Sequence, residues 1–287
     1  MKWEGHQKSE NFEDRRGMNK KGLAIGGGAA LLLLVAALFG IDPQKLMPLL
    51  GNPAGGPGGQ VQERPLTDQE KRSADFAATI LKFTEEVWDE QFRRQGQQYQ
   101  PPKMVFFAQQ VETGCGVAPS AVGPFYCPAD KTVYLDPTFF NELEQKLGGS
   151  KAEFSQAYVI THEVGHHVQN LLGYSNLVEE KRRTVSKEEY NQWSVRLELQ
   201  ADYLAGVWAH YGQQKFRFVE PGDIDAAMRS ANAIGDDRLQ TRATGFTSPE
   251  KYTHGTSAQR AKYFRLGLQT GDLSMLKRIF QVPYREL

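Results

Sequence analysis

The segment HEVGH, from His162 to His166, places the tightest constraint on how this chain can fold. Two histidines four positions apart lie on one face of an α-helix, one turn from each other, so their Nε2 atoms can converge on a single metal ion. Glu163 lies beside them and can handle a proton. Because three fixed residues can occur by chance, the rest of the sequence has to support this interpretation.

A metal site of the catalytic type needs a third protein ligand and keeps a fourth position for water. The longer pattern HExxHxxGxxH is excluded, because its glycine and third histidine would fall at Gln169 and Leu172. A carboxylate on a second helix is the other common solution. Within residues 196–206, Glu198 and Asp202 are four apart and share a helix face.

These spacings predict Glu198 as the third metal ligand and Asp202 as the acceptor of the Nδ1–H of a ligand histidine. The alternative is that both acids belong to a solvated charged face. Their neighbours are mostly apolar, however, which indicates a largely buried helix in which two acids need partners.

An uncharged apolar run occupies residues 22–41. At about 1.5 Å per residue, a helix of this length spans roughly 30 Å, the thickness of the hydrocarbon layer of a bilayer. We expect one uncleaved N-terminal transmembrane helix here. A cleavable signal peptide and a buried core helix are the alternatives.

The charges that flank this run predict its orientation. Four basic residues lie just before it and one lies close behind it, an asymmetry that places the N-terminus in the cytoplasm. The remainder would then be periplasmic or otherwise outside the cytoplasmic membrane, as in a single-pass inner-membrane protein. The flanking basic residues are Arg15, Arg16, Lys20, Lys21 and Lys45.

The composition divides the chain into four parts. Residues 1–21 are polar and predict a disordered cytoplasmic tail, residues 22–41 the anchor, and residues 42–65 a Gly/Pro-rich linker. Residues 66–287 form the domain. The formal net charge is zero, which argues against nucleic acid as a partner, because a surface that follows phosphates carries a basic excess.

Residue patterns within the domain predict a mostly helical α+β fold with a small antiparallel sheet before the HEVGH helix. Thr67 and Glu70 form a capping-box signature at the start of the first helix. Strands are expected at residues 104–107 and in a hairpin over 123–136. Helices are expected over residues 67–92, 137–148, 151–173, 187–211, 223–234 and 257–268.

The two cysteines, Cys115 and Cys127, are 12 positions apart in a stretch rich in Gly and Pro. A disulfide would close a short loop and stabilise the fold by about 3 kcal/mol. It would persist in an oxidising compartment, in agreement with a domain outside the cytoplasm. Two free buried thiols are the alternative.

Several segments together carry a resemblance to a known family. HExxH followed by ExxxD is similar to the gluzincin arrangement of thermolysin-like peptidases. The segments HEVGHHVQN, ELQADYLAG, CG…GPFYCPAD…VYLD and HGTSAQRAKYFRLG resemble the bacterial family of neutral zinc metallopeptidases. This resemblance covers nearly all of the chain after the linker. It implies a zincin-like domain that binds Zn²⁺ and, by analogy, acts on a peptide or protein substrate.

The expected activity is that of a membrane-anchored zinc peptidase with Glu163 as general base. His254 is the candidate donor to the developing oxyanion, and Tyr252 is the next. The alternative for His254 is a surface or helix-cap residue. The strand at residues 132–136 could pair with an extended substrate or be an ordinary strand packed on the HEVGH helix.

Other features have simpler interpretations. His167 points about 100° away from His166 and is expected to be a hydrogen-bonded packing residue, and His210 likewise has no site role. Gly165 could admit a neighbouring backbone. An intramembrane protease is excluded, because HEVGH lies in polar sequence far from the apolar run. The remaining alternative to an enzyme is a membrane-tethered binding or assembly module with a structural zinc.

Overall fold

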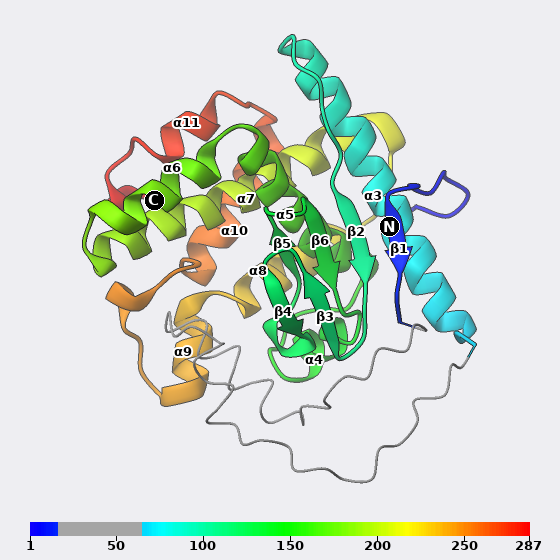
Figure 1. Cartoon of the computed structure of the whole chain (residues 1–287), viewed down its shortest axis with the longest axis horizontal. Helices are drawn as coiled ribbons and strands as arrows, with labels where there is room; N and C mark the ends of the chain where they lie inside the picture. The colour runs from blue at the N-terminus through cyan, green and yellow to red at the C-terminus, as the bar shows by residue number, and fades with distance from the viewer. Residues whose placement is uncertain (17–64) are drawn as a thin grey trace.

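The computed structural model describes residues 1–16 and 65–287, and Figure 1 shows how their helices and strands are arranged. The α-helices of this part are α3 (Asp68–Arg94), α4 (Phe139–Gln145), α5 (Glu153–Leu171), α6 (Tyr174–Thr184), α7 (Lys187–Phe216), α8 (Asp223–Ala233), α9 (Asp236–Thr244), α10 (Ser257–Thr270) and α11 (Met275–Ile279). The strands are β1 (Phe12–Asp14), β2 (Lys103–Phe106), β3 (Gln110–Thr113), β4 (Gly116–Pro119), β5 (Phe125–Cys127) and β6 (Thr132–Leu135). Short 3-10 helices are η1 (Ser120–Val122), η2 (Pro249–Lys251) and η3 (Tyr284–Glu286). The predicted mostly helical α+β class is therefore confirmed for the described residues.

The main sheet is mixed, which corrects the prediction of a small antiparallel sheet. Its strand order is β1-β2-β6-β5. β1, β2 and β6 run parallel, and β5 pairs antiparallel with β6. β3 and β4 form a separate antiparallel pair. The hairpin predicted over 123–136 is present as β5 and β6, whereas the parallel pairs join distant segments, which turn signals cannot reveal.

The N-terminal segment, residues 1–16, is folded onto the domain. The prediction of a disordered tail over residues 1–21 is therefore wrong for the part that the structure describes. β1 extends the sheet at its β2 edge, in the register Phe12↔Met104. Trp3 is 6% exposed and packs in the core. This one buried aromatic lies among charged and polar neighbours, which is why the composition concealed it.

Side-chain contacts also hold this segment against α3. The Ser9 hydroxyl donates a hydrogen bond to the Glu85 carboxylate, and the Asn11 amide donates to the same group at 2.8 Å. The folded body therefore includes residues 1–16 in addition to the predicted domain, residues 66–287.

The predicted transmembrane helix at residues 22–41 lies outside the described residues, as does nearly all of the predicted linker at 42–65. None of the helices that the structure describes has both the length and the apolar character required to cross a membrane. Membrane attachment therefore stays a prediction.

The helices form a frame around the sheet. In Figure 1, α6, α7, α10 and α11 lie together on one side of it, and α3 runs along the β1 side. The predicted capping box starts α3: the Glu70 N–H donates to the Thr67 hydroxyl at 3.2 Å, and the Thr67 N–H donates to the Glu70 carboxylate at 2.8 Å. α7 continues beyond the predicted end at Tyr211 and stops where Arg217 adopts a left-handed conformation, with φ 53°.

Two glycines let α7 and α10 approach each other closely. A Cβ at Gly206 would lie 2.1 Å from the Phe264 carbonyl oxygen, and a Cβ at Gly267 would lie 2.1 Å from the Tyr203 carbonyl oxygen. The two backbones are thus in direct contact, and larger residues would force the helices apart. This packing brings the α10 side chain Arg260 against α7.

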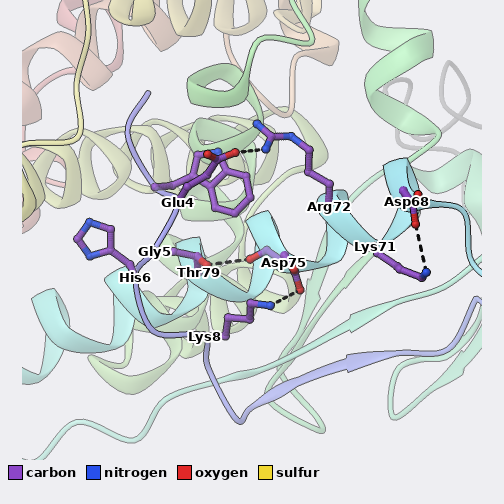
Figure 2. Close-up of a pocket in the computed structure, with 10 residues that line it drawn as sticks. Glu4, Gly5, His6, Lys8, Asp68, Lys71, Arg72, Asp75 and Thr79 are labelled. Carbon is purple, nitrogen blue, oxygen red and sulfur yellow. Dashed lines mark hydrogen bonds and ion pairs between the residues drawn. The ribbon is translucent and has the colours of Figure 1, made fainter.

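A cavity of about 470 Å³ lies between the N-terminal segment and α3. Figure 2 shows the residues that line it. The Arg72 guanidinium lies 4.9 Å from the centroid of the Trp3 ring, a cation–π contact. The lysine and arginine side chains of the lining each have an acidic partner, in the pairs Arg72–Glu4, Lys8–Asp75 and Lys71–Asp68. The pairs Arg72–Glu4 and Lys8–Asp75 join the segment to α3, whereas Lys71–Asp68 lies within α3. The lining contains none of the predicted metal-site residues.

Candidate metal centre

The three predicted ligands come together in the structure. His162 and His166 lie on α5, Glu198 lies on α7, and their ligand atoms are all within 4.8 Å of one another. Nε2 of His162 is 3.3 Å from one Glu198 oxygen, and Nε2 of His166 is 3.5 Å from the other. Both imidazoles therefore turn the same ring nitrogen toward one carboxylate.

The two helices meet because a glycine faces a small residue. A Cβ at Gly165 would lie 3.0 Å from the Ala201 carbonyl oxygen, so Gly165 does admit a neighbouring backbone. His162 faces Asp202 and His166 faces Glu198, so residue numbers rise along α5 as they fall along α7. The helices are therefore antiparallel at the site, and each offers an i, i+4 pair of functional side chains to the other.

Asp202 orients His162. Its Oδ1 is 2.9 Å from Nδ1 of His162, and it is fully buried. Arg260 donates to both carboxylate oxygens, at 2.9 and 3.1 Å, and the Tyr158 hydroxyl donates at 2.6 Å. Burial alone would raise the pKa of Asp202, but Arg260 and His162 hold this pKa below its ordinary value.

The charge of this cluster affects the ligands. Burial lowers the pKa of His162, but Asp202 and Glu198 outweigh it and raise this pKa to about 10. Burial alone would raise the pKa of Glu198. The surrounding histidines outweigh burial and hold this pKa far below its ordinary value. A metal ion must therefore displace a proton from His162 to bind, while Glu198 is already an anion.

A different side chain contacts His166. Oε1 of Gln169 is 2.8 Å from Nδ1 of His166, and the Gln169 Nε2–H donates to the Leu197 carbonyl at 2.6 Å. In the sequence, Gln169 served only to exclude the HExxHxxGxxH pattern, whose glycine would fall there, and Tyr158 and Arg260 were not predicted as site residues. Arg260 lies in the HGTSAQR segment, which was the one signal that could have pointed to it.

Glu163 follows the first ligand on α5 and is 8% exposed. No hydrogen bond from the described residues reaches its carboxylate. Its place on α5 directly after His162 therefore sets its position at the site, without a hydrogen bond from another described residue.

His254 is held by a buried acid that sequence reasoning missed. The His254 backbone N–H donates to Asp236 at 2.7 Å, and its Nδ1 is 3.3 Å from the same carboxylate. Burial lowers the pKa of His254, but Glu198 and Asp236 raise it above the ordinary value. Tyr252 is buried nearby in sequence.

The other histidines have the packing roles that the sequence predicted. Nδ1 of His167 is 3.0 Å from the Tyr126 hydroxyl, and its Nε2 is 2.6 Å from the Gln100 carbonyl oxygen. Burial lowers the pKa of His167 to about 4, so the ring is neutral at physiological pH. His210 contacts the Leu268 carbonyl, at 2.9 Å from Nδ1.

The predicted substrate strand at residues 132–136 is not available for pairing. It is present as β6, which lies between β2 and β5 and is hydrogen-bonded on both sides. The outer strand at this end of the sheet is β5, and it contacts the metal helix α5. The predicted disulfide is present and joins Cys115, at the turn of the β3–β4 hairpin, to Cys127 on β5.

Comparisons with known proteins agree with this site. A family described as "Putative neutral zinc metallopeptidase" matches residues 1–277. The uncharacterized protein YpfJ of Escherichia coli K12 is 44% identical over 95% of this chain and 96% of its own length. The uncharacterized protein Rv2575 of Mycobacterium tuberculosis is 47% identical over 61% of each chain. No solved structure matches this chain.

Proposed function

Because the chain belongs to this family, we propose that it is a zinc-dependent peptidase that hydrolyses peptide bonds with Glu163 as general base. The observation that carries the proposal is the meeting of His162, His166 and Glu198 within 4.8 Å. Two imidazoles and one carboxylate are a donor set of catalytic zinc sites, which leave a fourth position for water.

These residues would hold the zinc, which when bound lowers the pKa of a water and polarises the scissile carbonyl. Glu163 accepts a proton from the attacking water and delivers it to the leaving amine nitrogen. His254, held by Asp236, donates to the negative charge that develops on the carbonyl oxygen. Asp202 keeps His162 in the orientation that leaves its Nε2 for the metal.

The substrate in this proposal is an extended peptide or protein segment. A peptide can add as a further strand to a free sheet edge, which uses backbone hydrogen bonds and so accepts many sequences. β5 (Phe125–Cys127) is the outer strand nearest to α5 and takes the place of the strand first predicted at 132–136. The disulfide at Cys127 then fixes one end of this edge.

The proposal predicts about one zinc ion per chain, lost when His166 is replaced by leucine. The purified full chain, its His166→Leu variant and a His254→Gln variant are compared by metal analysis and by mass spectrometry of a digested peptide library. His254→Gln should keep the zinc and lose most of the cleavage. His6→Gln, at an exposed histidine far from these residues in sequence, is the control and should behave as wild type.

Two outcomes would contradict this proposal. Zinc that remains on His166→Leu would place the ion elsewhere. Zinc that is lost as expected, with no peptide cleaved by the wild-type protein, would favour the non-enzymatic membrane-tethered binding or assembly module.

We also propose that residues 1–16 and 65–287 lie on the same side of any membrane that the chain contacts. Neighbouring strands are about 4.8 Å apart, whereas the apolar layer of a bilayer is about 30 Å thick. β1 and β2 are neighbours, so a single crossing between residues 16 and 65 would remove β1 from the sheet. This proposal replaces the orientation predicted from the flanking charges, with the N-terminus in the cytoplasm and the domain in the periplasm.

Cysteine labelling in cells tests this topology. Lys8→Cys and Lys277→Cys introduce one exposed thiol on each part of the chain, and the existing cysteines are paired in the disulfide. A membrane-impermeant maleimide should label both positions in spheroplasts, or label both only after lysis. Labelling of one position without the other would restore the single-pass orientation.

A further inference from the structure

We propose that Gln169 is a positioning residue of the metal site, which determines the ring nitrogen that His166 offers to the metal. This inference rests on the proposed function, because the ring nitrogen that His166 presents matters only if the site binds a metal. The geometry of Gln169 itself stands independently of any activity.

Gln169 lies between the two helices that carry the ligands. It follows His166 by three positions on α5, so that both side chains share a face. It is fully buried, and its amide bridges Nδ1 of His166, at 2.8 Å, and the carbonyl oxygen of Leu197 on α7, at 2.6 Å. Both the oxygen and the nitrogen of the amide therefore have a partner, and the side chain is closed off from water.

The chemistry of these groups allows one assignment of protons. The Leu197 carbonyl can only accept, so the Gln169 NH₂ must face it. The Gln169 oxygen then faces His166 and can only accept, so Nδ1 of His166 must carry the hydrogen. A neutral His166 therefore keeps its lone pair on Nε2, the nitrogen that faces Glu198.

The same amide couples two ligands. Leu197 directly precedes Glu198, so the bridge connects the ring of His166 to the backbone that carries the third ligand. The close contact of Gly165 with Ala201 lies one helical turn away on both helices. Gln169 and this contact are therefore two adjacent points at which α5 meets the backbone of α7.

The two histidines are oriented by groups of different charge. His162 faces the anionic Asp202, which raises the basicity of the ring, whereas His166 faces a neutral amide. The amide supplies orientation without adding another carboxylate to those of Glu163, Glu198 and Asp202. Gln169 thus fixes the tautomer and adds no negative charge to the site.

The test compares Gln169→Leu, which removes both contacts, with Gln169→Glu, whose oxygen can still accept from Nδ1–H. Gln156→Leu is the matched control, because Gln156 lies on the same helix and donates to a backbone carbonyl, of Lys151, without touching a ligand. Nitrogen NMR of isotope-labelled histidines reports the His166 tautomer in chelator-treated protein. Competition with a chelator reports zinc affinity.

We expect the Nδ1–H form of His166 to predominate in wild type, Gln156→Leu and Gln169→Glu. In Gln169→Leu, the Nδ1–H form should no longer predominate. Zinc affinity should fall by about 10- to 100-fold in Gln169→Leu and stay unchanged in Gln156→Leu. A Gln169→Leu protein with the wild-type tautomer and affinity would overturn the proposal. If this variant does not fold, loss of the Nδ1–H form in Gln169→Glu would overturn it instead. Absence of zinc binding in wild type would contradict the proposed function and leave the tautomer measurement to decide on Gln169.

Discussion

Replacing Glu163 with glutamine should lower kcat for peptide cleavage by about 10²- to 10⁴-fold and leave the bound zinc in place. The amide has nearly the same size, but it cannot take a proton from the attacking water. No hydrogen bond from the described residues reaches the Glu163 carboxylate, so the exchange breaks no contact with them. Steady-state kinetics and zinc content, measured on the same sample, check this expectation.

Two further variants define the origin of the loss. Glu163→Asp keeps a base but shortens its reach, so its kcat should fall between those of the wild type and the glutamine variant. Glu180→Gln, on an exposed position of α6, makes the same chemical change away from the site and should have no effect. Cleavage at the wild-type rate by a zinc-loaded Glu163→Gln protein would show that another group removes the proton.

The site residues that the sequence could predict share a local geometric rule. His162 and His166 are four apart on one helix, and Glu198 and Asp202 are four apart on another, so helical periodicity alone places each pair on one face. The chemistry of zinc then requires a third ligand from elsewhere, and a buried acid pair is a suitable source. The capping box at Thr67 was predictable for the same reason, since it is complete within one turn.

The residues that the sequence could not predict act between elements that are distant in the chain. Arg260 reaches Asp202 across the contact of α10 with α7, and Asp236 reaches His254 from the start of α9. The spacing of three between His166 and Gln169 is visible in the sequence. The contact with the Leu197 carbonyl, which orients the Gln169 amide, is not. Such partners are brought together by the packing of distant helices, and this packing leaves no repeating pattern in the sequence.

The N-terminal strand was missed for a related reason. β1 is short and carries charged residues, as expected for an edge strand, so it has no apolar alternation to mark it. Its parallel partner β2 begins at Lys103, far along the chain. The prediction of a tail followed from composition, whereas long-range pairing decided the structure.

Arg260→Met should lower the free energy of unfolding by about 3–5 kcal/mol. Arg260 is 3% exposed, and its guanidinium donates to both oxygens of the fully buried Asp202. Its removal leaves a buried carboxylate with His162 and Tyr158 as its remaining partners. Urea unfolding of the metal-free proteins measures the difference without a contribution from zinc binding.

The origin of this loss can be separated from a simple packing defect. Arg265→Met changes an exposed arginine on the same helix and should alter the free energy of unfolding by less than about 0.5 kcal/mol. Adding Asp202→Asn to Arg260→Met removes the uncompensated charge, so the double variant should be more stable than Arg260→Met alone. A double variant that is less stable by the sum of both single losses would mean that Arg260 and Asp202 contribute independently. In that case the methylene groups of Arg260 would stabilise α10 through packing. The orientation of His162 would then depend on Asp202 and Tyr158 without the guanidinium.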